Sequence, residues 1–155
     1  MDLVVEPARA HDTAQIIELQ HLCYQTDAEL YDEYAIPPLT QTLENLLGEY
    51  DTHQVLAAQL KDKVVGSVRG RLVEGTYHIG RLILHPRLQR RGLGTRLMRA
   101  IEEHFVTAKR YELFTDHLSE GNPRLYRGLG YTEFRKETVS PQLQLVYLEK
   151  FRINS

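Results

Sequence analysis

The chain has 155 residues and a formal net charge of −2, and 42% of its residues are hydrophobic and 26% are charged. This length fits one domain, expected over residues 1–155, and the nearly neutral charge gives no reason to expect a nucleic acid or an anionic membrane as a partner. Because the single cysteine, Cys23, cannot form an internal disulfide, and no apolar run approaches the roughly 20 residues of a membrane helix, we expect a cytoplasmic protein.

Two helices are predicted near the start of the chain. Asp12 or Thr13 can cap a helix that continues with apolar residues at helical spacing to about Tyr31. Residues 35–38 must then leave helical geometry, because a proline disfavours the α conformation of the residue before it. Thr40 offers a cap for the second helix.

Several short strands are predicted in the first half. They lie at residues 3–5, at 55–60, from 64 onward and at 77–84, with turns at 61–63 and 74–75. The short turns predict an antiparallel meander. Arg69 and Arg71 alternate on one face of a strand, so we expect both to be solvated.

The second half predicts a helix between two strands. The helix spans residues 92–109, and its apolar stripe comprises Leu93, Leu97, Ala100, Ile101 and Phe105. A strand at 111–115 follows, which predicts a parallel pairing with the strand before the helix. A short helix at 122–129 and strands at 132–139 and 143–148 complete an α/β fold with a mixed, mostly antiparallel sheet.

The strongest chemical signal is the segment from Leu82 to Thr95, in which a strand ends, a basic loop follows and glycines open an amphipathic helix. The first N–H groups of a helix have no intrahelical partner, and the helix dipole adds partial positive charge there. Gly92 and Gly94 lack the Cβ atoms that would hold a phosphate away from the backbone. The pattern favours a bound phosphate or pyrophosphate, although a helix start with glycines for close packing looks the same. The spacing fits neither a Rossmann fingerprint nor a Walker loop.

Two segments resemble motifs of one family. Residues 89–94, Gln-Arg-Arg-Gly-Leu-Gly, resemble the acyl-CoA pyrophosphate loop of the GNAT superfamily of N-acyltransferases, Gln/Arg-x-x-Gly-x-Gly/Ala. Residues 122–131 resemble that family's next helix, Asn-x-x-x-Tyr-x-x-x-Gly-Phe/Tyr. The resemblance implies a GNAT-like central sheet flanked by helices in a single domain, with acetyl-CoA as co-substrate.

The resemblance also implies how the site is divided. The main chain of Leu82, Ile83 and Leu84 would bind the pantetheine arm. The pyrophosphate would lie against Gln89, Arg90, Arg91, Gly92, Leu93, Gly94 and Thr95. The Asn122 side chain would bind the cofactor arm, and the Tyr126 hydroxyl would face the thioester sulfur.

The implied reaction is direct attack of an uncharged primary amine on the thioester of acetyl-CoA. The protein must remove a proton from the amine and stabilise the departing sulfur, to which the Tyr126 phenol can donate. Glu112, Asp116, His117 and His78 are candidate bases, and no motif selects among them. The seven histidines show no paired metal spacing, so we expect no metal site, and Cys23 is expected to pack rather than react.

Three functions remain open at this point. They are an N-acetyltransferase, a transferase that uses another acyl group or acceptor, and a non-catalytic acyl-CoA-binding or sensor module on the same fold. A small-molecule or peptide amine is the expected acceptor. Asp27, Glu29, Asp32 and Glu33 favour a small cationic amine or a basic peptide end over an anionic metabolite by long-range attraction, unless they form only a solvated helix end. The apolar last strand, 143–148, predicts an uncovered sheet edge and a homodimer.

Overall fold

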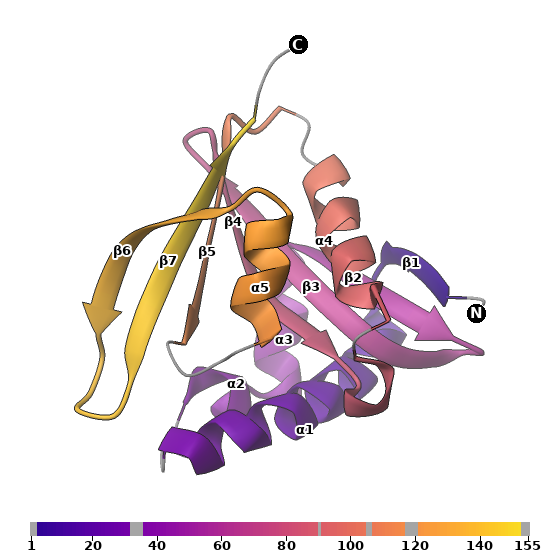
Figure 1. Ribbon diagram of the computed structural model, residues 1–155. Coiled ribbons are helices and arrows are strands. Elements are labelled where there is room, and N and C mark those ends of the chain that lie inside the picture. Colours follow the sequence, from indigo (N-terminus) through magenta and orange to yellow (C-terminus); the bar gives the residue numbers. More distant parts are fainter. Residues whose placement is uncertain (1–2, 32–35, 90, 105–106, 117–120, 153–155) are drawn as a thin grey trace.

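The computed structural model describes residues 3–31, 36–89, 91–104, 107–116 and 121–152 (Figure 1). In chain order its elements are β1 (Leu3–Pro7), α1 (Thr13–Tyr31), α2 (Pro37–Thr40), α3 (Leu43–Glu49), β2 (Gln54–Leu60), β3 (Lys63–Val73), β4 (Thr76–Leu84), α4 (Leu93–His104), β5 (Arg110–Asp116), α5 (Gly121–Gly128), β6 (Thr132–Thr138) and β7 (Gln144–Phe151). Short 3-10 helices, Ala10–Asp12 and Pro86–Leu88, precede α1 and follow β4. Within the described ranges, no helix combines the length and apolar character needed to span a membrane.

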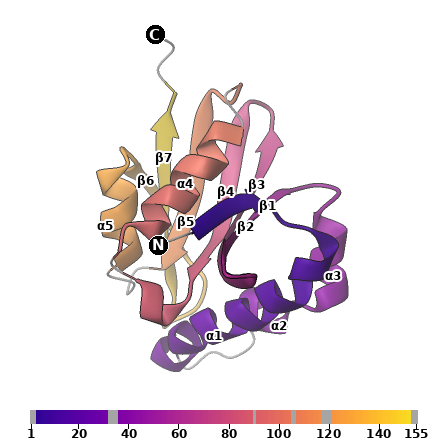
Figure 2. The same cartoon turned by 90° about the vertical axis from the view of Figure 1, so that its right-hand side faces the viewer.

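The strands form one seven-stranded sheet in the order β1-β2-β3-β4-β5-β7-β6. Neighbouring strands are antiparallel except β4 and β5, which are parallel because the crossover through α4 returns the chain to the same end of the sheet. Figures 1 and 2 show α4 and α5 on one face and α1, α2 and α3 on the other. The mixed, mostly antiparallel α/β fold predicted from the sequence is thereby confirmed.

The central strands are buried on both faces, because successive side chains of a strand point to opposite sides of the sheet. Leu56 of β2 packs in one cluster with Leu97 of α4, and its neighbour Val55 packs in a second cluster with Ile16 of α1. The sheet is therefore the middle layer of three, and its strand ends are where a site can open.

Some helix boundaries differ from the prediction. The Thr42 hydroxyl accepts a hydrogen bond from the N–H of Asn45 at 3.1 Å, so Thr42 caps α3 and Thr40 does not. The extra turn α2 tolerates its two prolines because the first turn of a helix needs no N–H donors. Helix α4 is described to His104, short of its predicted end, and Phe105 lies outside the described residues.

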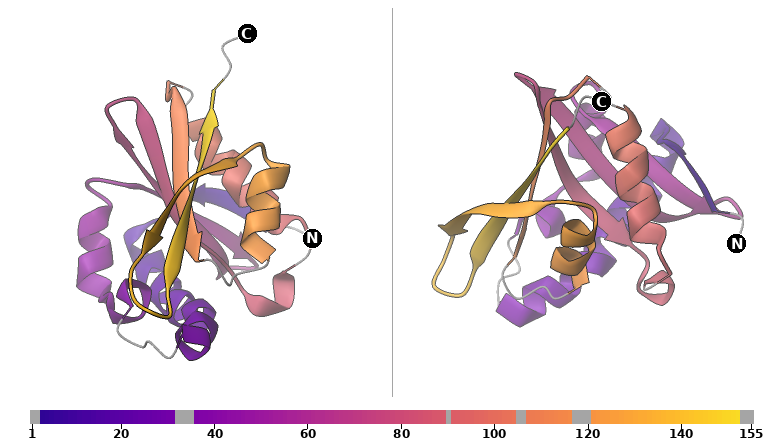
Figure 3. Two further views of the ribbon diagram at one scale, coloured as in Figure 1. Left: turned by 60° about the vertical axis from the view of Figure 1, so that its left-hand side comes forward. Right: turned by 45° about the horizontal axis from the view of Figure 1, so that its top comes forward.

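The last strand lies inside the sheet, and the prediction that it forms an uncovered edge is wrong. Strand β7 pairs with β5 on one side and with β6 on the other. The chain first passes to the outer position as β6 and then returns as β7, so β6 is the edge and is exposed along its length. Figure 3 shows the β6–β7 hairpin extending away from the half of the sheet that contains β1 to β4.

Arg69 is buried, with 2% exposure, so the prediction of a solvated side chain is correct only for Arg71. Its Nη2 donates to Gln20 Oε1 at 2.6 Å, and its Nη1 lies 3.7 Å from the Glu49 carboxylate. Burial lowers the pKa of Arg69 to about 10, against the opposing effect of Glu49, so the guanidinium stays charged at neutral pH. The buried guanidinium of Arg69, on β3, therefore binds side chains of both α1 and α3.

We expect Arg69→Ala to lower the free energy of unfolding by about 2 kcal/mol, because the Gln20 amide and the Glu49 carboxylate lose their donor inside the fold. Arg71→Ala is the matched control on the same strand and should change this free energy by less than about 0.5 kcal/mol. Urea unfolding followed by circular dichroism measures both. Equal losses in the two variants would contradict the role given to Arg69.

Candidate active site

Strands β4 and β5 separate after a short stretch of pairing. Their parallel ladder begins where Thr76 pairs with Arg110 and ends where His78 pairs with Glu112. Beyond this point β4 pairs only with β3 and β5 only with β7, and Figure 1 shows the two strands diverging toward α1. The backbone groups of residues 79–84 that face the gap have no strand partner in the described structure. A polar arm that enters the gap would gain hydrogen bonds there.

A bulge in β4 lies beside this gap. The register between β3 and β4 shifts between Ser67 and Arg69, where Arg81 and Leu82 together stand opposite one residue of β3. Arg81 has a φ of +52°, a left-handed conformation that costs a non-glycine residue roughly 1 kcal/mol. Leu82 packs toward the α4 cluster and Ile83 toward the α1 cluster. Bulges of this kind redirect side chains and are common next to functional sites.

The start of α4 is open to an anion. Its first helical hydrogen bond runs from the N–H of Arg96 to the carbonyl of Gly92 at 3.3 Å, so the N–H groups of residues 93–95 have no helical partner. Gly92 has a φ of +76°, and beyond its chain neighbours nothing lies within 4 Å of the place its Cβ would take. A Cβ on Gly94 would stand 3.1 Å from Leu125 of α5. Gly92 thus leaves room for a phosphate, while Gly94 allows close packing of α5.

The structure describes some of the remaining predicted cofactor residues and not others. Gln89 and Arg91 are exposed in the loop before α4, Leu93 is buried and Thr95 is half-buried in the first turn. The following lie outside the described residues or side chains: Arg90, His117, Asp32 and Glu33, and the side chains of Asp27 and Asn122.

Tyr126 is a buried residue of α5, the helix that Figure 1 shows beside the diverging strands β4 and β5. Its side chain is 5% exposed and packs edge-on against Tyr131, with 6.1 Å between ring centroids. Burial, and secondarily Tyr24, raises the pKa of Tyr126, so its hydroxyl is protonated at neutral pH. The Tyr131 hydroxyl donates to Glu102 at 2.6 Å, whereas the Tyr126 hydroxyl has no hydrogen bond with a described residue. Among the described residues, the Tyr126 hydroxyl is therefore a donor without a hydrogen-bond partner.

Helix α1 also reaches the site, which the sequence reasoning missed. The Cys23 thiol donates to the carbonyl of Leu84 at 3.3 Å, in keeping with its predicted packing role. Burial is the main cause of the pKa shifts of Tyr126 and Arg69, and the neighbouring Tyr24 contributes to both shifts. Tyr24 therefore lies within electrostatic reach of α5 on one side and of the buried arginine on the other.

The candidate bases fall into two groups. The Glu112 carboxylate lies 2.8 Å from Arg110 Nη1 and 3.5 Å from His78 Nδ1, so the structure brings Glu112 and His78 together in one ion-pair cluster. Asp116 is half-buried at the end of β5, on the part of that strand that β4 does not pair with. Of the candidate bases that the structure describes, Asp116 is the one beyond the end of the β4–β5 ladder, where His78 pairs with Glu112.

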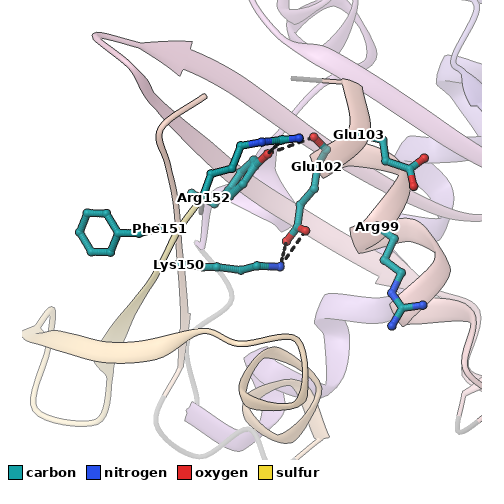
Figure 4. Close-up of a pocket in the computed structure, with 7 residues that line it drawn as sticks. Arg99, Glu102, Glu103, Lys150, Phe151 and Arg152 are labelled. Atoms are coloured by element: carbon teal, nitrogen blue, oxygen red, sulfur yellow. Dashed lines mark hydrogen bonds and ion pairs between the residues drawn. The ribbon is translucent and has the colours of Figure 1, made fainter. Parts of the chain in front are cut away.

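A pocket of about 400 Å³ lies at the other end of α4 (Figure 4). Glu102 accepts hydrogen bonds there from Lys150 at 2.9 Å and from Tyr131 at 2.6 Å, and Arg152 donates to the Tyr111 hydroxyl at 2.8 Å. These groups bind one another and connect α4 to β5 and β7. None of the predicted site residues lines this pocket, and we assign it a structural role.

The chain is similar in fold to several solved structures. The PaiA N-acetyltransferase from Thermoplasma acidophilum, in complex with coenzyme A, aligns with a TM-score of 0.81 and 15% identity over 98% of this chain and 100% of that one. YncA from Salmonella typhimurium, with its cofactor acetyl-CoA, aligns with a TM-score of 0.78 and 18% identity over 100% and 96%. The ribosomal-protein-S18-alanine N-acetyltransferase from Escherichia coli aligns with a TM-score of 0.76 and 12% identity over 95% and 92%. At these identities the likeness establishes the fold.

Sequence comparison identifies the family. No curated protein matches the chain. The sequence profile described as "Acetyltransferase (GNAT) family" matches residues 13–131. This match covers most of the chain, from the start of α1 to Tyr131, and includes the loop before α4 and the helix that carries Tyr126. The chain therefore belongs to the Acetyltransferase (GNAT) family.

Proposed function

We propose that this protein is an acetyl-CoA-dependent N-acetyltransferase in which a primary amine attacks the thioester directly. The observation that carries the proposal is the buried Tyr126, whose hydroxyl has no partner among the described residues. Family membership supports acetyl transfer, and the structures of PaiA and YncA contain coenzyme A and acetyl-CoA. A protein that only binds acyl-CoA has no need of an uncommitted donor at the sulfur.

The described residues fit this co-substrate. The unpaired N–H groups of Leu93, Gly94 and Thr95 would bind the pyrophosphate, in the positive field of the helix start. The backbone of residues 82–84 would bind the pantetheine arm at the gap between β4 and β5. Bound acetyl-CoA would supply the activated acetyl group.

Two protein groups would then take part in proton transfer: Tyr126 as the donor, and a base as the acceptor. Tyr126, protonated at neutral pH, would donate its hydroxyl hydrogen to the departing sulfur. A base must take a proton from the amine, and the candidates remain Glu112, Asp116, His78 and His117. Glu112 contacts Arg110 and His78, and Asp116 is a second described carboxylate, on the part of β5 that β4 does not pair with.

The acceptor in this proposal is a small-molecule or peptide amine. The similar structure from Escherichia coli is a ribosomal-protein-S18-alanine N-acetyltransferase, which supports a peptide amine as one option. The acidic residues in the last turns of α1 and directly after it support a small cationic amine. A homodimer stays a prediction, and the exposed β6 is the edge through which two copies would pair.

Thiol release from acetyl-CoA, measured across a panel of polyamines, aminoglycosides, amino acids and short peptides, tests the proposal. We expect release that depends on the amine. Release with propionyl-CoA but not acetyl-CoA, or with alcohols but not amines, would favour the transferase with another acyl group or acceptor. Tight binding of acetyl-CoA without release for any acceptor would favour the non-catalytic module.

A further inference from the structure

A second pocket, of about 280 Å³, opens beside the helices α2 and α3. It is lined by Pro37, Thr40, Gln41, Thr42, Asn45 and Arg81, and we call it the Arg81 pocket. Among the described residues of this lining, Arg81 is the charged one, and it comes from the β4 bulge directly before Leu82. Its guanidinium has no ion pair or hydrogen bond with a described residue. A positive charge without a partner in the described part of the chain therefore lies next to the strand segment proposed for the pantetheine arm.

A chain of amide side chains leads from Arg69 to this pocket, and Arg69 fixes the orientation of each amide. A guanidinium can only donate, so Gln20 must turn its oxygen toward Arg69, at 2.6 Å, and its nitrogen toward Gln41 Oε1, at 2.9 Å. Gln41 Oε1 also accepts from Arg69 at 3.3 Å, so its nitrogen is the atom that donates to Asn45 Oδ1, at 2.8 Å. The last amide nitrogen, that of Asn45, remains a donor without a described partner in the pocket lining.

Thr42, like Asn45, presents a hydrogen-bond donor to the pocket. Its oxygen accepts the hydrogen bond that caps α3, so its hydroxyl hydrogen remains available to donate. The Gln41 side chain has no hydrogen-bonding capacity left, because its oxygen and its nitrogen are each bonded twice. The pocket therefore offers the guanidinium of Arg81, the amide N–H groups of Asn45 and the hydroxyl of Thr42. A carboxylate, which only accepts, matches this set of donors.

Two arginines and one carboxylate lie at or behind the pocket lining: Arg81, Arg69 and Glu49, whose carboxylate accepts a hydrogen bond from Gln41. Arg69 lies behind Gln41 and is balanced by Glu49 at 3.7 Å. Burial is the main cause of the lowered pKa of Arg69; Glu49 opposes it, and Arg81 contributes in the same direction as burial. No described carboxylate balances the charge of Arg81.

The location separates this pocket from the cofactor phosphates. Those phosphates would lie at the start of α4, which covers one face of the sheet, whereas α2 and α3 lie on the other face (Figure 2). Arg81 also keeps its left-handed backbone conformation at this point, and such strain persists mainly at functional sites. With the cofactor bound at α4 as proposed, this pocket would lie on the opposite face of the sheet, where an acceptor could bind.

We propose that the Arg81 pocket binds a carboxylate carried by the amine acceptor, so that the substrate class is an amino acid or a peptide with a carboxylate near its reactive amine. This inference rests on the proposed acetyl transfer. It competes with a purely cationic acceptor such as a polyamine, and with a phosphate-bearing amine that offers the same acceptor atoms.

The test uses acceptor pairs that differ only in the anionic group. Glycine and glycinamide, leucine and leucinamide, and glucosamine 6-phosphate and glucosamine would be compared by kcat/KM in the thiol-release assay. The ratio within each pair is then compared between the parent and Arg81→Gln, which cancels the different basicity of the two amines. We expect the carboxylate preference to fall by roughly 10- to 100-fold in Arg81→Gln, the scale of one lost charge-assisted bond.

Two further variants make the test specific. Asn45→Asp keeps an oxygen for Gln41 but puts a negative charge in the lining, so it should lower the same preference. Arg71→Gln, an exposed residue of β3, should leave the preference unchanged. A preference that is the same in the parent and Arg81→Gln would overturn the inference while leaving acetyl transfer standing. Preference for the phosphate pair alone would overturn the carboxylate assignment.

A binding experiment tests the pocket without turnover. N-acetylleucine and N-acetylleucinamide would be titrated by calorimetry into the protein saturated with coenzyme A. We expect tighter binding of the carboxylate, lost in Arg81→Gln. Absence of thiol release with every amine would count against the proposed function, and equal or absent binding of the two acetylated probes would count against the pocket.

Discussion

Tyr126→Phe is expected to lower kcat by roughly 10- to 10⁴-fold, the scale of a lost proton or hydrogen-bond donor, with little change in acetyl-CoA affinity. The substitution keeps the buried ring and its contact with Tyr131, and it removes only the uncommitted hydroxyl. Because burial raises the pKa of Tyr126, the donor is present throughout the neutral pH range, so the loss should not depend on pH there. Steady-state thiol release and calorimetry give the two quantities.

Tyr131→Phe is the matched control for this prediction. It removes a buried hydroxyl that donates to Glu102, so we expect lower stability with kcat nearly unchanged. An unchanged kcat in Tyr126→Phe, under conditions where the chemical step limits the rate, would remove Tyr126 from the mechanism.

Gly92→Val is expected to lose most of its affinity for acetyl-CoA, which we expect to lie in the micromolar range for the parent. The new side chain would occupy the open space beside the unpaired N–H groups of α4, and loss of two phosphate hydrogen bonds corresponds to about 100-fold in affinity. Gly94→Val should also lose affinity, but its Cβ would press on Leu125, so it changes α5 as well. Calorimetric titration measures each variant.

Gly75→Val controls for backbone strain. Gly75 has a φ of +85° in the turn between β3 and β4, with open space around its Cβ position, so it carries the same conformational cost as Gly92 away from α4. We expect it to lose stability but to bind acetyl-CoA normally. Binding by folded Gly92→Val and Gly94→Val that equals the parent's would show that the phosphate loop is assigned wrongly.

Most of the fold could be predicted from local sequence patterns. The apolar spacing of α4, the turns with positive φ at Asp62 and Gly75, and the strand–helix–strand order that makes β4 and β5 parallel are all decided by residues close in sequence. The position of β7 in the sheet is not decided by residues close in sequence. Either β6 or β7 could pair with β5 without any change in the hydrophobic pattern of the two strands.

The residues of the candidate site also fall into two classes, those that local motifs indicate and those whose roles depend on contacts distant in sequence. The glycines of α4 and Tyr126 stand in motifs with fixed spacing, so sequence alone indicated them. Arg69 was misassigned because its partner Gln20 is distant in sequence, and strand alternation cannot show that α1 covers that face. Arg81 and Tyr24 carry no motif, and their roles depend on a bulge and on the packing of α1.

The most direct test of the central claim is a stoichiometry measurement. Acetyl-CoA labelled in the acetyl group would be incubated with the protein and the best amine of the panel, and both thiol release and the labelled product would be quantified by mass spectrometry. We expect one labelled N-acetyl amine for each thiol released, and a parallel fall of both in Tyr126→Phe. Thiol release without an acetylated amine, or acetyl-CoA binding with neither product, would contradict it.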